Sequence, residues 1–315
     1  MKVSLVIPVY YNQDNLGPLY EDIQEKLLLD SRVEWEIVFV NDGSADRSWE
    51  VIKELARKDD RVRGFSLSRN FGSHSAILCG LAECTGDCAV IKAADLQEPT
   101  ELVFDLIKSW QEGNNVVLAE RAEREEGRSQ VAFANLYYSI VRKTALPTMP
   151  KGGFDVYLLD RKVINVLTSL DETNSALTGQ ILWSGFKTGH VPYVRHAREI
   201  GTSKWTLRKK VRLVMDTLFS FSNVPITAVL VVGGVSVLIA LIWAIVVLVA
   251  RLTGNIAAVG YTSLFIMQLL SFGIIMLTLG ILGEYLWRTF DASRGRPPYI
   301  IEDKFPEDGS AKDKD

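Results

Sequence analysis

The sequence predicts an α/β domain with a mostly parallel sheet, followed by an interfacial amphipathic helix and a hairpin of two transmembrane helices. Up to about residue 120, short apolar runs alternate with amphipathic segments. This alternation is typical of a parallel sheet covered by helices on both faces. After Pro225, two long stretches carry no charged residue, and each exceeds the roughly 20 residues needed to cross the hydrocarbon core of a membrane.

The elements of the first part follow one another in a regular order. Strands are expected at Val3–Val9, Glu36–Val40, Val62–Leu67, Cys88–Ile91, Val116–Leu118 and Val156–Leu159. Helices are expected between the first five strands, at residues 14–29, 46–58, 72–84 and 99–112. Ligands of such sheets bind beyond the carboxyl ends of the strands, so the polar residues that follow each strand are the candidates for a functional site.

The two uncharged stretches are expected to form transmembrane helices at residues 225–250 and 257–283, joined by a loop too short to be a domain. Basic residues precede the first helix and follow the second, at Lys204–Arg212 and at Arg288, Arg294 and Arg296. The loop carries only Arg251. The positive-inside rule therefore predicts an integral membrane protein whose α/β domain and two termini are cytoplasmic.

Between the α/β domain and the hairpin, residues 204–223 interleave basic and bulky apolar side chains. This pattern favours a helix that lies in the membrane interface, although a solvated surface helix can show it too. The tail from Glu302 to Asp315 is charged and poor in apolar residues, which predicts disorder. The expected division is an α/β domain at 1–203, the interface helix at 204–223, the hairpin at 225–283 and a polar cytoplasmic tail at 284–315.

Composition excludes some classes of function. The formal net charge of −3 gives no excess of basic residues of the kind that binds a nucleic acid. The three cysteines, Cys79, Cys84 and Cys88, are an odd number at close spacing, which argues against a disulfide framework. Reduced thiols packed in the core are the expected state.

Four motifs lie at the ends of the expected strands. They are IPVYYNQDN at 7–15, VNDGSADRS at 40–48, SRNFGSHSAI at 68–77 and ADLQEP at 94–99. In this order they resemble glycosyltransferase family 2, and with the hairpin they resemble its polyprenyl-phosphate glycosyltransferases, of the bactoprenol glucosyltransferase and dolichol-phosphate mannose synthase kind. The resemblance implies a GT-A Rossmann-like domain that binds a nucleotide-sugar donor.

The resemblance implies that the nucleotide contacts Pro8, Tyr10 and Asp42. An aromatic ring can stack near a base, and a carboxylate can accept hydrogen bonds from uracil or ribose. Asp42 also fits a purely structural role in an Asn-Asp-Gly-Ser turn, where aspartate is favoured. Arg69 precedes an expected helix start, where anions are favoured, and is a further candidate for the nucleotide.

The metal site departs from the family pattern. Enzymes of this kind carry Asp-Ala-Asp-x-Gln after the fourth strand, which binds Mg²⁺ or Mn²⁺ against the diphosphate. Here Ala93 takes the place of the first carboxylate. Asp95 and Gln97 keep oxygen ligands suited to Mg²⁺, which commonly uses one or two carboxylates with phosphates and waters. A working site and a site of lowered metal affinity are both compatible with this change.

The acceptor implied by the resemblance is a polyprenyl phosphate, which is already an anion. Two unit charges about 4 Å apart repel by about 4 kcal/mol at an effective dielectric of about 20, so cations must offset its approach to the donor diphosphate. The candidates for the acceptor phosphate are Arg121, Arg124, Asn135, Ser139 and Lys204. Arg124 equally fits a solvated run with Glu123, Glu125 and Glu126. Asp95, Asp155 and Arg198 are the candidate catalytic residues.

The function expected from the resemblance is inverting transfer of a single hexose, from UDP-glucose, to undecaprenyl phosphate at the cytoplasmic membrane face. GDP-mannose or UDP-GlcNAc are alternative donors. Ala93 also allows a catalytically weak scaffold that binds a nucleotide sugar. Gln180 and Trp183 form a reduced version of the Gln-x-x-Arg-Trp signature of processive synthases, with Leu182 replacing the arginine, which argues against polymer synthesis. The expected partners are the donor, the lipid acceptor and the bilayer, and a homo-oligomer is compatible with the sequence.

Overall fold

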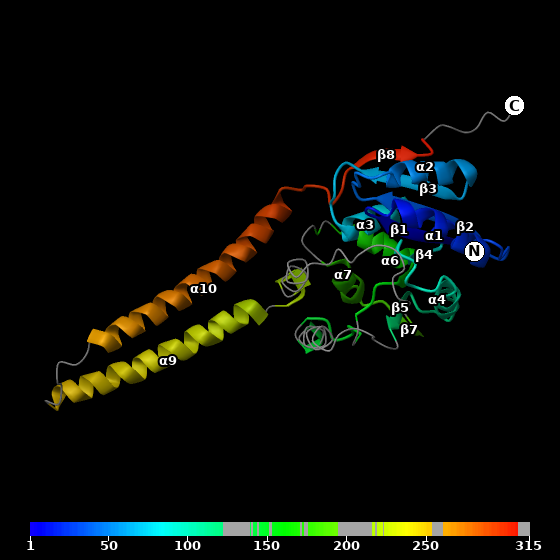
Figure 1. The fold of residues 1–315 in the computed structure, drawn as a ribbon. Helices are drawn as coiled ribbons and strands as arrows, with labels where there is room; N and C mark the ends of the chain where they lie inside the picture. The colour runs from blue at the N-terminus through cyan, green and yellow to red at the C-terminus, as the bar shows by residue number, and fades with distance from the viewer. Residues whose placement is uncertain are drawn as a thin grey trace.

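An eight-stranded mixed sheet forms the centre of the structure, a computed structural model, with the strand order β7-β5-β6-β4-β1-β2-β3-β8 (Figure 1). The structure describes residues 1–121, 139, 141–143, 145–150, 153–170, 172, 176–194, 216–217, 219–222, 224–253 and 261–307. Most neighbouring strands are parallel, and the antiparallel pairs involve only β6 and β8. The mostly parallel α/β fold expected from the sequence is confirmed.

The strands match the apolar runs of the sequence. Their bounds are β1 (Lys2–Val9), β2 (Glu34–Asn41), β3 (Val62–Leu67), β4 (Cys88–Ile91), β5 (Val116–Arg121), β6 (Tyr157–Asp160), β7 (Thr188–Tyr193) and β8 (Ile301–Phe305). In β2, every residue after Glu34 is buried. Such continuous burial requires a cover on both faces of the sheet, which explains why the run is apolar throughout rather than alternating.

Helices supply that cover. Those of the α/β domain are α1 (Gln13–Lys26), α2 (Ser48–Lys58), α3 (Ser73–Glu83), α4 (Leu102–Gln111), α6 (Arg161–Thr168) and α7 (Leu177–Trp183). One core contains Ile7, Phe39 and side chains of α1, α2 and α4. The other contains Val6, Val40 and side chains of α3, α6 and α7. Cys79, Cys84 and Cys88 are buried free thiols, as expected.

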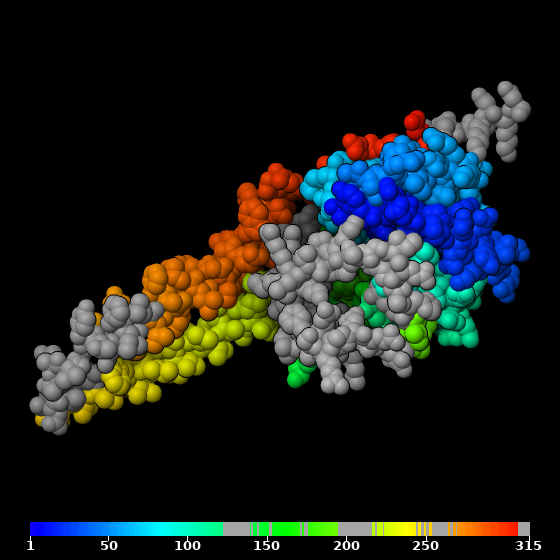
Figure 2. Space-filling model, in the orientation of Figure 1, coloured from blue at the N-terminus to red at the C-terminus, as the bar shows by residue number. Residues whose placement is uncertain are grey.

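Two long helices, α9 (Val224–Leu252) and α10 (Tyr261–Ser293), lie side by side and extend away from the α/β domain (Figures 1 and 2). Each is long and apolar enough to cross a membrane, over Val224–Trp243 and Leu270–Ser293. Their large apolar side chains are exposed rather than packed into the domain. Of the expected interface helix, the structure describes only short helical pieces from Asp216 onward, so its place at a membrane stays a prediction.

The root of the hairpin contacts the α/β domain. Arg288 of α10 donates to Asp216 over 2.9 Å and to Glu284 over 2.9 Å. The ring of Phe221 lies against Gly179 of α7, where an added Cβ would come within 2.2 Å of it. The chain before α9 is therefore held on one side by an ion pair and on the other by a close ring contact.

The expectation of a disordered tail from Glu302 is wrong for its first residues. Ile301–Phe305 forms β8, which pairs antiparallel with β3 and lies beside it in Figure 1. The indole Nε1 of Trp49 donates to Asp303 over 3.0 Å. The charged composition suits an edge strand, because charges at a sheet edge discourage pairing with other chains.

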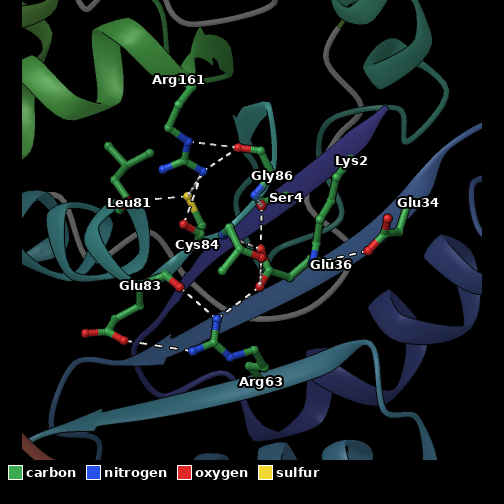
Figure 3. Close-up of polar contacts among 11 residues, drawn as sticks. Lys2, Ser4, Glu34, Glu36, Arg63, Leu81, Glu83, Cys84, Gly86 and Arg161 are labelled. Atoms are coloured by element: carbon green, nitrogen blue, oxygen red, sulfur yellow. Dashed lines mark hydrogen bonds and ion pairs between the residues drawn. The ribbon is translucent and has the colours of Figure 1, made fainter.

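A buried polar network holds the amino-terminal ends of β1 and β2 (Figure 3). The carboxylate of Glu36, only 4% exposed, accepts from Ser4 Oγ at 2.5 Å, Thr85 N at 2.8 Å and Arg63 Nη1 at 3.0 Å. Burial alone would raise the pKa of Glu36, but these hydrogen bonds outweigh burial and hold the pKa below its ordinary value of 4.5. Glu36 therefore stabilises the fold in its charged form.

We expect Glu36→Gln to lower the free energy of unfolding by about 3 kcal/mol, because it leaves the Arg63 charge without its buried partner. The contribution of Glu36 is fully present above the ordinary glutamate pKa and is lost as pH falls through the lower pKa of the folded state. Denaturant unfolding in detergent, measured at neutral and acidic pH, tests both statements. Glu34→Gln, an exposed neighbour paired with Lys2, is the control and should change little; equal effects would contradict the prediction.

Candidate active site

The directions of the strands bring the candidate residues to one edge of the sheet. β1 to β4 run parallel, β6 runs opposite to β4, and β5 runs opposite to β6. The carboxyl ends of β1 to β5 and the start of β6 therefore share an edge. Asp42, Asp95 and Arg121 lie at strand ends on this edge, and Asp155 lies just before β6.

Asp42 organises the corner between β2 and β3. Its carboxylate, 3% exposed, accepts from Phe71 N at 2.7 Å and from Gly72 N at 3.0 Å. Its own N–H donates to Val9 O over 2.8 Å. Asp42 thus joins the ends of β1 and β2 to the amide groups at the start of α3, whichever ligand it also contacts.

The loop that follows β3 packs tightly on Gly43. Gly43 has a φ of +62°, and a Cβ at this position would lie 2.3 Å from the carbonyl carbon of Arg69. The guanidinium of Arg69 lies 3.9 Å from the centre of the Phe71 ring, and the side chain is exposed. The loop therefore presents a cation beside the start of α3, where amide groups favour an anion.

Two adjacent tyrosines follow β1. The rings of Tyr10 and Tyr11 meet edge to face, with centroids 4.7 Å apart, and Tyr11 has a φ of +54°. Tyr11 N donates to Ser44 Oγ over 3.0 Å. Pro8 pairs with Val40 within the sheet. The aromatic pair is thus held next to the Asp42 corner, at the position expected for a base.

The expected metal ligands lie in a tight turn after β4. Gln97 N donates to Asp95 Oδ1 over 3.4 Å, and Leu96 between them has a φ of +56°. Asp95 and Gln97 are partly exposed. Among the residues that the structure describes, no group of three or more His, Cys, Asp or Glu side chains could hold a metal ion.

Lys92, beneath this turn, is a residue that the sequence reasoning missed. It is 2% exposed, and its Nζ donates to the carbonyl oxygen of Glu98 over 2.7 Å. Burial lowers the pKa of Lys92, while the nearby carboxylates of Glu98, Asp22 and Asp95 oppose that shift. A lysine at the end of an apolar strand, two residues before the start of the ADLQEP motif, was the signal that could have revealed it.

The structure pairs two candidates that the sequence reasoning treated separately. The guanidinium of Arg121 donates to the carboxylate of Asp155. Burial would lower the pKa of Arg121, but Asp155 raises it above its ordinary value. The side chain of Arg121 is 15% exposed and that of Asp155 is 52% exposed. Asp155 therefore holds Arg121 at the edge of the site and compensates its charge.

The remaining candidates are only partly covered. Ser139 is a partly buried helical residue. Arg124, Asn135, Arg198 and Lys204 lie outside the described residues, so their roles stay predictions. Gln180 is buried and donates to Glu172 over 3.4 Å, whereas Trp183 is exposed.

A cleft of about 400 Å³ opens at the opposite edge of the sheet, where Lys2, Arg61 and Arg63 are among its lining residues. These cations already pair with Glu34, Asp59 and Glu36 respectively. The chemistry gathered at the carboxyl ends of the strands makes that edge, and not this cleft, the candidate active site.

Comparisons with known proteins agree with the expected family. The family model described as glycosyl transferase family 2 matches residues 4–201. A prophage bactoprenol glucosyl transferase homolog from Escherichia coli (strain K12) is 36% identical over 304 residues, which cover 96% of this chain and 99% of that protein. An uncharacterized glycosyltransferase from Bacillus subtilis (strain 168) is 34% identical over 306 residues, which cover 97% of this chain and 94% of that protein.

Among solved structures, S. aureus TarS in complex with UDP-GlcNAc has a TM-score of 0.48 and 16% sequence identity. That match covers 70% of this chain and 67% of the other. The two sequence relatives, in contrast, match nearly the whole chain, the hairpin included.

The packing of Gly43 predicts the effect of a single methyl group. Gly43→Ala should lower the free energy of unfolding by about 2 kcal/mol, because alanine is strained at this φ and its Cβ would meet the loop backbone. Gly17→Ala in α1, where an added Cβ meets nothing within 4 Å beyond its chain neighbours, is the control and should cost less, because the helix-favouring gain of alanine offsets its crowding against Pro18. Denaturant unfolding of both variants is the measurement. A Gly43→Ala protein as stable as the parent would contradict the prediction, because it would show that the loop around Arg69 moves away from the added Cβ without cost.

Proposed function

This chain belongs to glycosyl transferase family 2, and from that premise we propose that it transfers one hexose from a nucleotide sugar to a polyprenyl phosphate. UDP-glucose is the proposed donor and undecaprenyl phosphate the proposed acceptor. The observation that carries the proposal is the similarity to bactoprenol glucosyl transferases over nearly the full length of the chain, at 36% and 33% identity. The chain is accordingly a glycosyltransferase, and the donor and acceptor are the parts to be tested.

The proposed reaction is a single in-line displacement. A phosphate oxygen of the acceptor forms the new bond to the anomeric carbon, and the bond from that carbon to the donor diphosphate breaks with both electrons leaving on the nucleoside diphosphate. The acceptor is already an anion, so no strong base is needed. One displacement inverts the anomeric centre, and an α-linked donor gives a β-linked lipid product.

The charges of the site must offset the repulsion between the two phosphorylated substrates. Asp155 already compensates the charge of Arg121. The pair therefore orients a hydrogen-bond donor at the site but adds little net positive charge. We therefore assign the excess positive charge to Arg198 and Lys204, with Arg124 as a further contributor, and a hydrogen-bonding role to Asn135 and Ser139. Preorganised cations of this kind stabilise charge in the transition state without reorganisation.

A divalent cation, Mg²⁺ or Mn²⁺, fits the oxygen donors of Asp95 and Gln97. With one carboxylate and one amide from the protein, most remaining ligands would come from the donor phosphates and water, which is common for Mg²⁺. Such an ion supplies positive charge to the departing diphosphate. The loss of a carboxylate at Ala93 predicts weaker binding of the ion before the donor arrives.

The proposed setting is the cytoplasmic face of a membrane. The hairpin would span the bilayer with both termini in the cytoplasm, and residues 204–223 would lie at the level of the headgroups. In this arrangement the domain at 1–203 meets the lipid phosphate while the lipid tail stays in the bilayer. A homo-oligomer is compatible with this arrangement.

Asp95→Ala should reduce transfer by about 10²–10³-fold, because it removes the carboxylate placed to hold charge against the diphosphate. The protein should remain membrane-bound. Transfer of radiolabelled sugar to polyprenyl phosphate in the presence of Mg²⁺ is the assay, and Asp105→Ala, an exposed carboxylate on α4, is the control. Arg198→Ala should lose transfer in the same way. Full activity in both Asp95→Ala and Arg198→Ala would refute this assignment of the site.

The donor is tested by a thermal-shift panel of UDP-glucose, UDP-GlcNAc, UDP-galactose and GDP-mannose with Mg²⁺ or Mn²⁺. A ligand present at about 100 times its Kd stabilises the folded state by about 2.7 kcal/mol, and UDP-glucose should give the largest shift. A larger shift with GDP-mannose would reassign the donor. Donor binding without any lipid product would instead favour a nucleotide-sugar-binding scaffold, the role that Ala93 leaves open.

A further inference from the structure

We propose that strand β8 is a positioning segment for the donor site, so that the chain emerging from the hairpin helps to set the affinity for the nucleotide. This inference rests on the proposed function, because it takes the ligand to be a nucleotide. It extends that function to residues 300–305, which lie beyond the family match at 4–201. These residues carry none of the four motifs.

β8 is attached to the last part of β3. Ile301 pairs with Leu67, and Ser68 N donates to Ile300 O over 3.0 Å. Side chains hold the rest of the strand, since Asp303 in its middle accepts from Trp49 Nε1. The guanidinium of Arg57 lies 5.3 Å from the centre of the Phe305 ring. Both contacts come from α2, so β8 is held by a neighbouring strand and by a helix.

The hydrogen bond at Ser68 reaches the donor corner through one short loop. Ser68 begins the loop whose Phe71 and Gly72 amides donate to Asp42. The backbone of Arg69 in the same loop packs against Gly43 without room for a methyl group. A loop held so closely at both ends cannot shift at Ser68 without moving the amides that hold Asp42.

The same strand is joined to the hairpin by a short link. α10 ends at Ser293 and β8 begins at Ile301, and the residues between them can span at most about 25 Å. Tyr299 in this link packs against the core that contains Cys79 and Phe65. Residues 294–297 are exposed. The polypeptide thus runs from the membrane helix to the donor corner with one exposed stretch on the way.

A purely protective role for β8 is the competing explanation, because an added strand covers the edge that β3 would otherwise expose. The two explanations predict different measurements. An edge cover changes the stability of the domain and leaves the nucleotide affinity of the folded protein unchanged. A positioning segment changes the affinity of the folded protein for the nucleotide.

The direct test severs the link. A protease site inserted between Gly295 and Arg296 in the full-length protein allows β8 to be cut from α10 after folding and then washed away. Binding of UDP with Mn²⁺ is measured before and after cleavage, with circular dichroism as the control for folding. We expect the affinity for UDP to fall by about tenfold, as for the loss of hydrogen bonds that hold a binding loop, and a peptide of residues 296–307 to restore it. Unchanged affinity after removal of the strand would overturn the proposal.

A series of substitutions covers the case in which the cut protein unfolds. Asp303→Ala removes the acceptor for Trp49 and should weaken UDP binding, whereas Asp303→Asn keeps an acceptor oxygen and should restore it. Glu302→Ala, the exposed neighbour on the same strand, is the matched control and should bind UDP as the parent does. An affinity for UDP that is the same in the parent and in all three variants would overturn the proposal.

The two proposals fail in different ways. If the parent protein binds no nucleotide, the proposed function fails at its first step. If the parent binds UDP and transfers sugar while every β8 variant binds UDP equally well, only the role of β8 fails. Transfer activity is not needed for the binding measurement, so a defect in acceptor binding cannot be mistaken for either result.

Discussion

The shared direction of strands β1 to β5 is the constraint on which the site depends. Because their carboxyl ends meet at one edge, residues more than 100 positions apart in the sequence, such as Asp42 and Asp155, come to the same edge of the sheet. A sheet buried on both faces offers few other places for polar chemistry. The interior is apolar on either side, and the loops beyond the strand ends are where charged groups can meet a ligand and remain hydrated.

The carboxylates Glu36 and Asp95, at opposite edges of the sheet, differ in burial. At the amino-terminal edge, Glu36 accepts hydrogen bonds from three other segments and is closed off by protein groups. At the carboxyl edge, Asp95 and Gln97 stay partly exposed in a turn with a left-handed residue between them. A satisfied carboxylate stabilises a fold, whereas a carboxylate in an open turn can exchange its contacts for those of a ligand. This difference separates Glu36, which stabilises the fold, from Asp95, the candidate ligand.

Much of the fold could be predicted because burial leaves a pattern in the sequence. Val62–Leu67 and Cys88–Ile91 are expected and observed with the same bounds, since a strand covered on both faces must be apolar throughout. β8 could not be predicted in this way, because none of the residues of IEDKF is fully buried at the sheet edge and the segment resembles a polar tail. The pair of Arg121 and Asp155 was missed as a pair, because only the antiparallel placement of β6 brings the two residues together. Lys92 shows the same limit, since its burial depends on the turn after β4, where its Nζ donates to Glu98 O.

The attachment of the hairpin has a consequence for how the molecule divides into parts. A domain boundary is usually a stretch that few contacts cross, and the expected boundary at residue 203 would leave α9 and α10 as a separate unit. The observed chain returns after α10 to complete the sheet at β8, and Phe221, ahead of α9, lies against Gly179 of α7. The hairpin is thus tied to the α/β domain at both of its ends. A hairpin tied at both ends is restricted in rotation about its links, so the edge that carries Asp42 and Asp95 keeps a defined direction relative to α9 and α10.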